Sequence, residues 1–297
     1  MPAEILIVLK PLVFVILAAI PLLPLIVYFF LDRRNRLKRS VIPIRVDLPR
    51  PAGFSLQKKI EELEDTILSY SIGLFMAGIY IAYLVVEQDL YIVGFALALI
   101  YIPYFSYSCA RSGREQRNYR LGQLGEQAVG ACLAELTGKD CKVFHDLVIE
   151  EGKKRIWNID HVVVCSKGVF CLETKCRRKM LGTSKGDKTR GWEVVFDGNT
   201  IEYPFGKDRF GLEQAERNAK WLEKFVREST AETVSVLPVL VLPGWFVHRK
   251  AHGKVRVINE KELPQVIARG PDVLDQGTIQ RISYQIRQKC LMTFEGS

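Results

Sequence analysis

Three charged side chains stand in two apolar stretches of the chain, where a strand buried on both faces would carry none. Asp160 lies in NIDHVVVCSK, and Glu173 and Lys175 lie in GVFCLETK, which follows directly. The polar link with a glycine at 166–168 predicts a tight turn between antiparallel strands. In such a hairpin Asp160 faces Glu173, with Cβ atoms about 4.5 to 5.5 Å apart.

Two carboxylates at this separation have the chemistry of a divalent-cation site. They repel each other and resist joint ionisation unless a cation lies between them. Mg²⁺ usually takes one or two carboxylates and keeps water ligands for a phosphate substrate, and Mn²⁺ accepts the same oxygen ligands. Lys175 shares the face of Glu173 because strands have a period of two, so its ammonium could orient a metal-bound water. The alternative is that all three charges meet solvent at strand ends, but their shared face on apolar strands favours a site.

Helices and strands around this hairpin must hold it in place. The hairpin strands are expected at 156–165 and 168–175. Residues 114–137 form a predicted helix with the apolar stripe Leu121, Leu124, Ala128, Cys132 and Leu136. The other expected elements are a strand at 141–149, a small hairpin over WEVVFDGNTIEYP with its turn at Asp197-Gly198, a helix at 209–228, strands at 233–242 and 254–258, and a helix at 276–289. This order predicts an α/β domain with a mixed sheet flanked by helices.

Three uncharged stretches, each 21 residues long, precede residue 111: 11–31, 66–86 and 90–110. As helices they would each be about 30 Å long, the thickness of a bilayer's hydrocarbon core. We therefore expect a membrane region over residues 1–110, with transmembrane spans at about 8–31, 66–86 and 90–110 and a basic linker at 32–65. Within the linker, SLQKKIEELED predicts an amphipathic helix that leads into the second span. Burial in a soluble protein is the alternative, which the lack of polar faces disfavours.

Basic residues indicate how the spans are oriented. Lys and Arg are concentrated in 32–65 and after residue 110, whereas EQD at 87–89 contains none. Because basic loops stay cytoplasmic, we expect a multi-pass protein of the inner (cytoplasmic) membrane, with its N-terminus outside and the chain after residue 110 in the cytoplasm. The lipid bilayer is thus one partner. The small-residue motifs GLFMA at 73–77 and GIYIA at 78–82 would pack the spans together or form a homo-oligomer.

Cysteine and histidine placement argues against two other kinds of site. The seven cysteines are scattered without the spacing of a metal finger, and the four histidines form no cluster. In a reducing cytoplasm the cysteines are expected to be ordinary thiols, and a zinc site is not expected.

Four pieces of the soluble half carry a specific resemblance. They are GEQAV at 125–129, NIDHVVV at 158–164, GVFCLETK at 168–175 and EQAERNAKWL at 213–222. In this order they resemble the nuclease-related domain (NERD) family, a branch of the PD-(D/E)xK nuclease superfamily. The resemblance covers about residues 121–242. It implies a restriction-endonuclease-like mixed β-sheet core in a domain at 111–245, with residues 246–297 as a C-terminal extension that carries a short strand and a helix.

The resemblance also implies roles for individual residues. Asp160 and Glu173 would bind Mg²⁺, Lys175 would position the attacking water, and Glu126 and Gln214 would complete the site. The family commonly has Asn-Pro a few residues before this Gln, and the chain lacks it there. Close helix packing is the alternative role for Glu126, and a place on the rim is the alternative for Gln214. His161 is expected on the opposite face, as a packed strand histidine.

A basic loop follows the second hairpin strand. CRRKMLGTSKGDKTR supplies the candidate nucleic-acid-binding residues Arg177, Arg178, Lys179, Lys185, Lys188 and Arg190. They would hold a nucleic-acid backbone beside the metal, DNA in preference to RNA by the resemblance. A solvated loop and a contact with anionic lipid are the alternatives. GWFVHRKAHGK at 244–254 could stack bases or pack in the core.

Taken together, the sequence predicts a membrane-anchored, Mg²⁺-dependent nuclease that hydrolyses phosphodiester bonds in the cytoplasm with low sequence specificity. The alternative is a membrane tether that binds nucleic acid or a protein partner without catalysis. A catalytic site explains adjacent buried like charges, for which a binding module has no use.

Overall fold

The computed structural model describes residues 49–136, 141–151, 154–179 and 192–291. These residues divide into two compact units. Unit 1 contains residues 59–117, and unit 2 contains residues 49–58 and 118–291. Each unit is described by itself. The first expected span, at 8–31, lies outside the described residues.

Unit 1 consists of parts of two long helices, α3 (Phe54–Val86) and α4 (Tyr91–Ala134). Both are long and apolar enough to span a membrane. Only 11% of the most apolar 18-residue stretch of α3 is buried, and only 6% of that of α4. The core helix of a soluble protein would be mostly buried, so these exposed apolar surfaces agree with the second and third expected spans. The described part of the chain therefore contains two apolar helices that could cross a bilayer.

Small residues bring α3 and α4 together at one position. A Cβ added to Gly73 would lie 2.6 Å from the ring of Phe105, whereas one added to Gly78 would meet nothing within 4 Å. Of the two small-residue motifs, the one at 73–77 therefore packs the helix pair. The motif at 78–82 begins on an open surface.

The helices are longer than expected. The predicted amphipathic helix at 55–65 and the predicted helix at 114–137 are not separate elements, because α3 and α4 run through both boundaries. The expected breaks were placed where apolar residues give way to charged ones. Such a change ends a membrane span but leaves the backbone hydrogen bonds of a helix intact, and neither boundary contains a proline.

Unit 2 is built on a five-stranded sheet in the order β1-β2-β3-β7-β9. The strands are β1 (Lys142–Glu151), β2 (Lys154–Cys165), β3 (Gly168–Thr174), β7 (Val236–Val241) and β9 (Arg256–Ile258). The first three pair antiparallel, and β3, β7 and β9 pair parallel. The predicted mixed sheet is thus confirmed.

The central hairpin has the expected register. Val162 pairs with Cys171 and Cys165 pairs with Gly168, so continuation of the ladder would place Asp160 opposite Glu173. The paired residues of both strands, 161–165 and 168–172, are buried. Their Val, Ile and Phe content suits a sheet that is covered on both faces.

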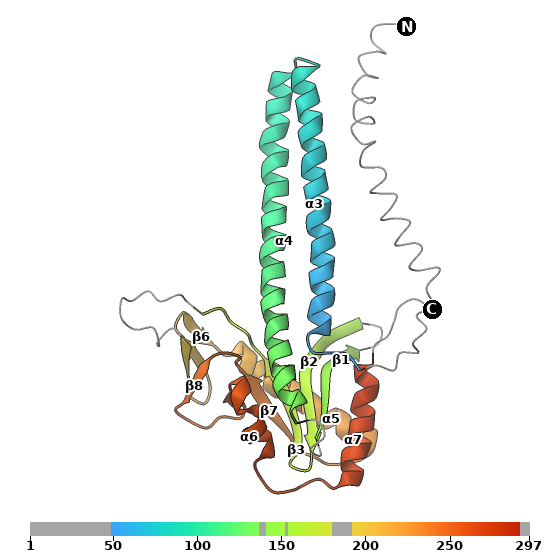
Figure 1. Ribbon diagram of the computed structural model, residues 1–297, viewed down its shortest axis with the longest axis vertical. Helices are drawn as coiled ribbons and strands as arrows, with labels where there is room; N and C mark the ends of the chain where they lie inside the picture. Colours follow the sequence, from blue (N-terminus) through green and yellow to red (C-terminus); the bar gives the residue numbers. More distant parts are fainter. Residues whose placement is uncertain (1–48, 137–140, 152–153, 180–191, 292–297) are drawn as a thin grey trace. The chain divides into compact units, whose positions relative to one another are not determined.

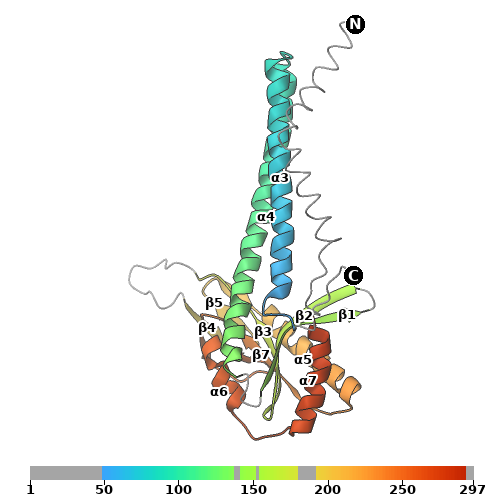
Figure 2. The ribbon, with the colours of Figure 1, turned by 45° about the vertical axis from the view of Figure 1, so that its right-hand side comes forward.

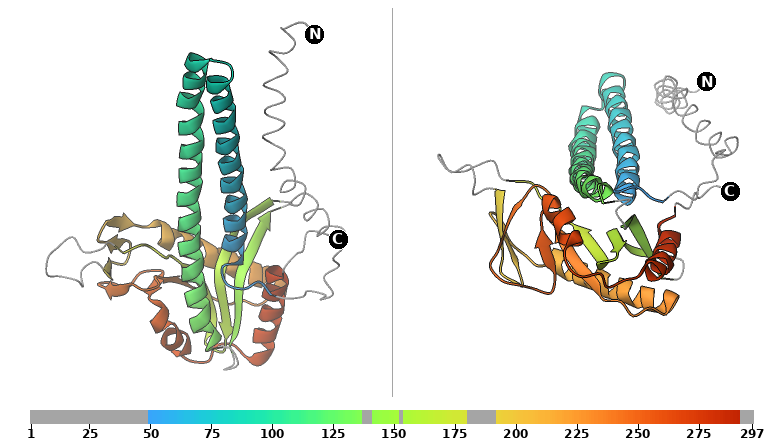
Figure 3. Two further views of the ribbon diagram at one scale, coloured as in Figure 1. Left: turned by 45° about the horizontal axis from the view of Figure 1, so that its top comes forward. Right: turned by 60° about the horizontal axis from the view of Figure 1, so that its bottom comes forward.

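Helices cover the two faces of this sheet (Figures 2 and 3). One face packs against α5 (Phe210–Thr230) and α7 (Gln276–Cys290) through an aliphatic cluster that includes Leu222 and Ile282. The other face packs against the end of α4 and against α6 (Leu263–Ala268), which follows the 3₁₀ turn Glu260–Glu262. The hairpin is therefore held in the middle of three layers.

The predicted apolar stripe of the 114–137 helix is correct only at its end, where Leu136 is buried and Cys132 packs against the same cluster. Leu124 is 62% exposed, and the buried face instead carries Val129 and Leu133 together with Glu126. Glycines explain the choice of face, because a Cβ at Gly125 would lie only 2.6 Å from the Cβ of Cys176. Close approach of the helix outweighs the larger apolar side chains on the neighbouring stripe.

A second, four-stranded sheet has the order β6-β5-β4-β8 (Figure 1). Its strands are β4 (Glu193–Phe196), β5 (Ile201–Tyr203), β6 (Gly206–Asp208) and β8 (Phe246–Arg249). The expected hairpin is β4–β5, and Asp197 accepts hydrogen bonds from two backbone N–H groups of its turn. Residues 246–291, expected as a C-terminal extension, supply β8, β9, α6 and α7 to unit 2.

Candidate active site

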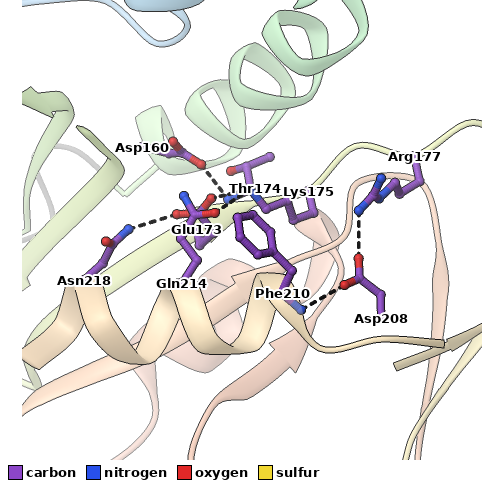
Figure 4. A network of polar contacts seen from close by, with 9 residues as sticks. All are labelled: Asp160, Glu173, Thr174, Lys175, Arg177, Asp208, Phe210, Gln214 and Asn218. Atoms are coloured by element: carbon purple, nitrogen blue, oxygen red, sulfur yellow. Dashed lines mark hydrogen bonds and ion pairs between the residues drawn. The ribbon is translucent and has the colours of Figure 1, made fainter. Parts of the chain in front are cut away.

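Asp160 lies where the ladder between β2 and β3 ends. The last pair is His161 with Leu172, and beyond it the backbone N–H of Thr174 donates to Asp160 Oδ2 over 2.7 Å (Figure 4). The residue is only 6% exposed. Its carboxylate therefore replaces a backbone acceptor at the point where the two strands separate.

Glu173 and Lys175 form the centre of a polar network at the end of β3 (Figure 4). Lys175 Nζ donates to Glu173 Oε1 over 2.7 Å and to Gln214 Oε1 over 2.9 Å. Asn218 Nδ2 donates to the other oxygen, Glu173 Oε2, over 3.0 Å. Both oxygens of a carboxylate that is 1% exposed are thus held in fixed positions.

Helix α5 supplies the two amides of this network. Gln214 and Asn218 lie four residues apart and so occupy one face of the helix, while Ala215, Ala219 and Leu222 beside them are buried against the sheet. Sequence reasoning found Gln214 but missed Asn218. The signal was available, because a buried stripe at i and i+4 predicts that the polar residue one turn after Gln214 faces the same strands.

The site contains more buried acid than its cations offset. Burial raises the pKa of Asp160 well above its ordinary value, and repulsion from Glu173 and Glu126 adds to this effect. Burial also raises the pKa of Glu173, against the opposing attraction of Lys175 and Arg217. A cation placed among these carboxylates would therefore be stabilised by the charges it neutralises.

Glu126 brings a third acid to this region from α4. Burial, followed by repulsion from Asp146 and Glu173, raises the pKa of Glu126 to about 8. A hydrogen bond from the Gly53 backbone and the attraction of Lys175 oppose the rise. Close packing was the alternative role for this residue, and the structure gives it both features: a packed position and an electrostatic connection to the site.

Asp146 is a further buried acid, and sequence reasoning missed it. It is fully buried in β1 with a positive φ of 50°. It accepts hydrogen bonds from Ser55 Oγ over 2.6 Å and from Asn158 Nδ2 over 2.8 Å, and Arg50 donates to its backbone carbonyl over 3.2 Å. An aspartate inside the apolar run VFHDLVI was the signal. Its partners Arg50 and Ser55 could not be found, because they lie far away in the sequence.

We expect Asp146→Ala to destabilise unit 2. The change leaves buried donors on Ser55 and Asn158 without this acceptor, at a cost of about 3 kcal/mol in the free energy of unfolding. Thermal unfolding of the purified full chain in detergent measures the effect. Asp272→Ala is the matched control, since Asp272 forms an exposed ion pair with Lys167 and its loss should move the melting temperature little. Equal melting temperatures for the two variants would contradict the prediction.

The basic residues that follow β3 have different surroundings. Arg177 Nη2 pairs with Asp208 Oδ2 over 2.7 Å, Arg178 is exposed, and Lys179 Nζ lies 4.5 Å from the centre of the Trp192 ring. All three residues are exposed, and Arg177 has an acidic partner there. The other three candidates, Lys185, Lys188 and Arg190, lie outside the described residues.

His161 takes the packed position expected for it. It is fully buried, and its Nδ1 lies 2.8 Å from Nδ1 of His145 on the neighbouring strand β1. Burial lowers the pKa of His161 well below its ordinary value, which keeps the ring neutral. In GWFVHRKAHGK, Trp245 packs in the core and Phe246 is 58% exposed, so core packing holds for the tryptophan and base stacking stays a prediction.

The oxygen donors of the hairpin fit a divalent cation, although no cluster of three is present. Among the described residues, no three His, Cys, Asp or Glu side chains lie close enough together to hold a metal ion. Mg²⁺ needs only one or two carboxylates, because it keeps several water ligands. The pair of Asp160 and Glu173 supplies that number, with the hard oxygen ligands and the excess negative charge that such an ion requires.

A groove elsewhere in unit 2 provides a useful comparison. It has a volume of about 690 Å³ and is lined by Arg249, Arg256 and Arg269 among other residues, and none of the candidate site residues contributes to it. Basic side chains of this groove can therefore serve as controls for the site.

Comparison with known proteins supports the resemblance. Residues 121–243 match the family model described as the nuclease-related domain, NERD. A search of curated proteins and a search of solved structures each found no match. The matched range contains the whole candidate site, from Glu126 on α4 to the end of β7. Residues 121–243 of this chain are therefore a nuclease-related (NERD) domain.

Proposed function

We propose that this protein is a membrane-anchored nuclease that depends on a divalent cation and hydrolyses phosphodiester bonds, with DNA as its substrate. The observation that carries the proposal is the buried pair of Asp160 and Glu173 with the ammonium of Lys175 beside it. A cation held by the two carboxylates, together with the ammonium, would stabilise the negative charge of a phosphoryl group at this buried position. The preference for DNA rests on the family resemblance alone.

Each residue of the site has a role in this reaction. Asp160 and Glu173 would hold Mg²⁺ or Mn²⁺, which when bound supplies charge for the phosphate oxygens and acidifies a water molecule. Lys175 has three ammonium protons and gives two of them to Glu173 and Gln214, so the third remains to orient water or phosphate. As the water oxygen bonds to phosphorus, the bond from phosphorus to the leaving sugar oxygen breaks and that oxygen takes up a proton. Asn218 would hold Glu173 in position through its hydrogen bond, and Glu126 would complete the site from α4.

The nuclease assay requires the full chain. Residues 49–58 belong to unit 2 and contact Asp146, so a soluble piece that starts at residue 111 would lack part of the domain. Purified protein in detergent is incubated with supercoiled plasmid, linear duplex, single-stranded DNA and RNA, with Mg²⁺, Mn²⁺ or EDTA. Cation-dependent cutting supports the proposal. Binding without cutting in every condition supports the non-catalytic tether instead.

We also propose that the second and third spans cross the inner membrane as a hairpin, with the NERD domain in the cytoplasm. The support is the length of the two apolar helices and the absence of basic residues at 87–89 between them. The first span and a homo-oligomer formed through the spans are parts of the same proposal, and the open surface at Gly78 leaves room for a neighbouring helix.

This orientation predicts a labelling pattern. A membrane-impermeant maleimide applied to intact cells should label Gln88→Cys, because residue 88 lies in the short link outside the membrane. The wild-type chain serves as the control, since its seven cysteines should react only after the cells are opened. Labelling of the wild-type protein in intact cells, with no increase for Gln88→Cys, would reverse the assignment.

A further inference from the structure

A large aromatic ring stands at the rim of the candidate site. Phe210 opens helix α5 and is 59% exposed, and Lys175 Nζ lies 5.6 Å from the centre of its ring (Figure 4). Exposure of an aromatic ring to water is unfavourable, although single exposed apolar side chains are common on protein surfaces. The position beside the proposed reacting phosphate makes this ring different from the others.

The backbone of Phe210 is fixed from two sides. Its N–H donates to Asp208 Oδ1 over 2.8 Å. The second oxygen of Asp208 pairs with Arg177, which lies two residues after Lys175. The next residue is Gly211, where a Cβ would lie 3.2 Å from Lys175 Cγ. The start of α5 is thus held close against Lys175, and the ring is presented in one place.

A ring in this position can receive a nucleobase. Bases stack on exposed aromatic side chains without regard to sequence, because every base has a flat π face. A phosphate bound at Lys175 would bring its attached nucleotide within reach of Phe210. In a duplex both faces of each base are covered by neighbouring bases, so only an unpaired or unstacked nucleotide offers a free face.

Lys179 and Trp192 form a second pair of a cation and an exposed ring. Trp192 is 54% exposed, and Lys179 Nζ stands 4.5 Å from the centre of its ring. Lys179 lies four residues after Lys175, so two basic side chains that follow β3 each have an exposed aromatic ring beside them. Cationic groups that hold the backbone, interleaved with rings that hold the bases, are typical of single-strand binding.

We propose that Phe210 is a base-stacking residue and that the strand engaged at this site is single-stranded nucleic acid. The inference rests on the proposed function, since it assumes that a phosphate binds beside Lys175. It adds the substrate class, which the carboxylates and the lysine do not define.

The test is a binding measurement that does not require cutting. Fluorescence anisotropy in EDTA gives the Kd of the full-length protein in detergent for a short single strand and for a duplex of the same sequence. Phe210→Ala should raise the Kd for the single strand about 5- to 100-fold and change the duplex Kd less than about twofold. Phe210→Trp, which keeps an aromatic ring at this position, should bind the single strand as the wild type does. Tyr284→Ala is the matched control, because Tyr284 is 62% exposed on α7, and it should change neither Kd.

The outcomes separate this inference from the nuclease proposal. An equal loss of single-strand and duplex binding in Phe210→Ala, or no loss, overturns base stacking. The same holds if the tryptophan variant fails to restore binding while its melting temperature matches the wild type. A protein that binds single strands through Phe210 but never cuts them with Mg²⁺ or Mn²⁺ supports base stacking and refutes the nuclease.

Discussion

Replacement of Asp160 by asparagine or of Glu173 by glutamine is expected to lower cation-dependent cleavage about 10³-fold or more. Each change removes one of the two negative charges that would hold the cation, and loss of several kcal/mol of stabilisation corresponds to a factor of this size. The fold should survive, because each amide keeps the size of the acid that it replaces and an oxygen that can accept the same hydrogen bonds. Initial rates of plasmid nicking at saturating Mg²⁺ measure the effect.

Two comparisons make this result specific. Arg256→Ala removes a surface charge in the groove that contains no candidate site residue, so it should keep the wild-type rate within about twofold. Lys175→Met should lose activity like the acid variants, because it removes the ammonium but keeps most of the side-chain volume. If Asp160→Asn and Glu173→Gln both cleave at the wild-type rate, at the Mg²⁺ concentration used for the wild type, the chemistry lies elsewhere in the protein.

The second large effect is a fall in stability as the pH rises without metal. The ordinary pKa of Glu126 is 4.5, and its pKa in the folded protein is about 8. Above pH 4.5 the unfolded chain releases this proton while the folded protein keeps it, so the free energy of unfolding falls until about pH 8. At about 1.4 kcal/mol per pH unit, the loss is on the order of 5 kcal/mol. The raised pKa of Asp160 acts in the same direction.

Divalent cations should reverse this loss only where the acids ionise. Metal ligands must be deprotonated, so Mg²⁺ should raise the melting temperature at pH 8 to 9 and have little effect at pH 5. Thermal unfolding in EDTA and in Mg²⁺ across this range measures both effects. Glu126→Gln should flatten the pH dependence in EDTA, whereas Glu213→Gln, at an exposed position of α5, should leave it unchanged. A melting temperature that rises with pH in EDTA would contradict the prediction.

The centre of the site was predictable because it depends on local rules. A short turn fixes the register of a hairpin, and the two-residue period of strands then places Asp160, Glu173 and Lys175 at one end of it. The structure has this register, and it adds the hydrogen bonds from Thr174 and Asn218. The catalytic roles of these residues remain predictions.

The periphery of the site depends on contacts between distant parts of the chain. Nothing near Asp146 in the sequence indicates that Arg50 and Ser55 bind it. Nothing near Arg177 indicates that Asp208 of β6 pairs with its guanidinium. The packing face of α4 was mispredicted for a related reason, because the glycines that decide it matter only against a partner surface.

The order of unit 2 along the chain constrains how the protein is made. Residues 49–58 contribute the Arg50 and Ser55 contacts, residues 118–291 contribute the rest, and the apolar hairpin of unit 1 lies between the two pieces. A ribosome therefore releases the first piece, then both apolar helices, and only then the strands that bear the carboxylates. The complete domain cannot assemble on a chain whose hairpin has not yet been synthesised, so under the proposed topology the domain is completed only after the hairpin has been delivered to the bilayer.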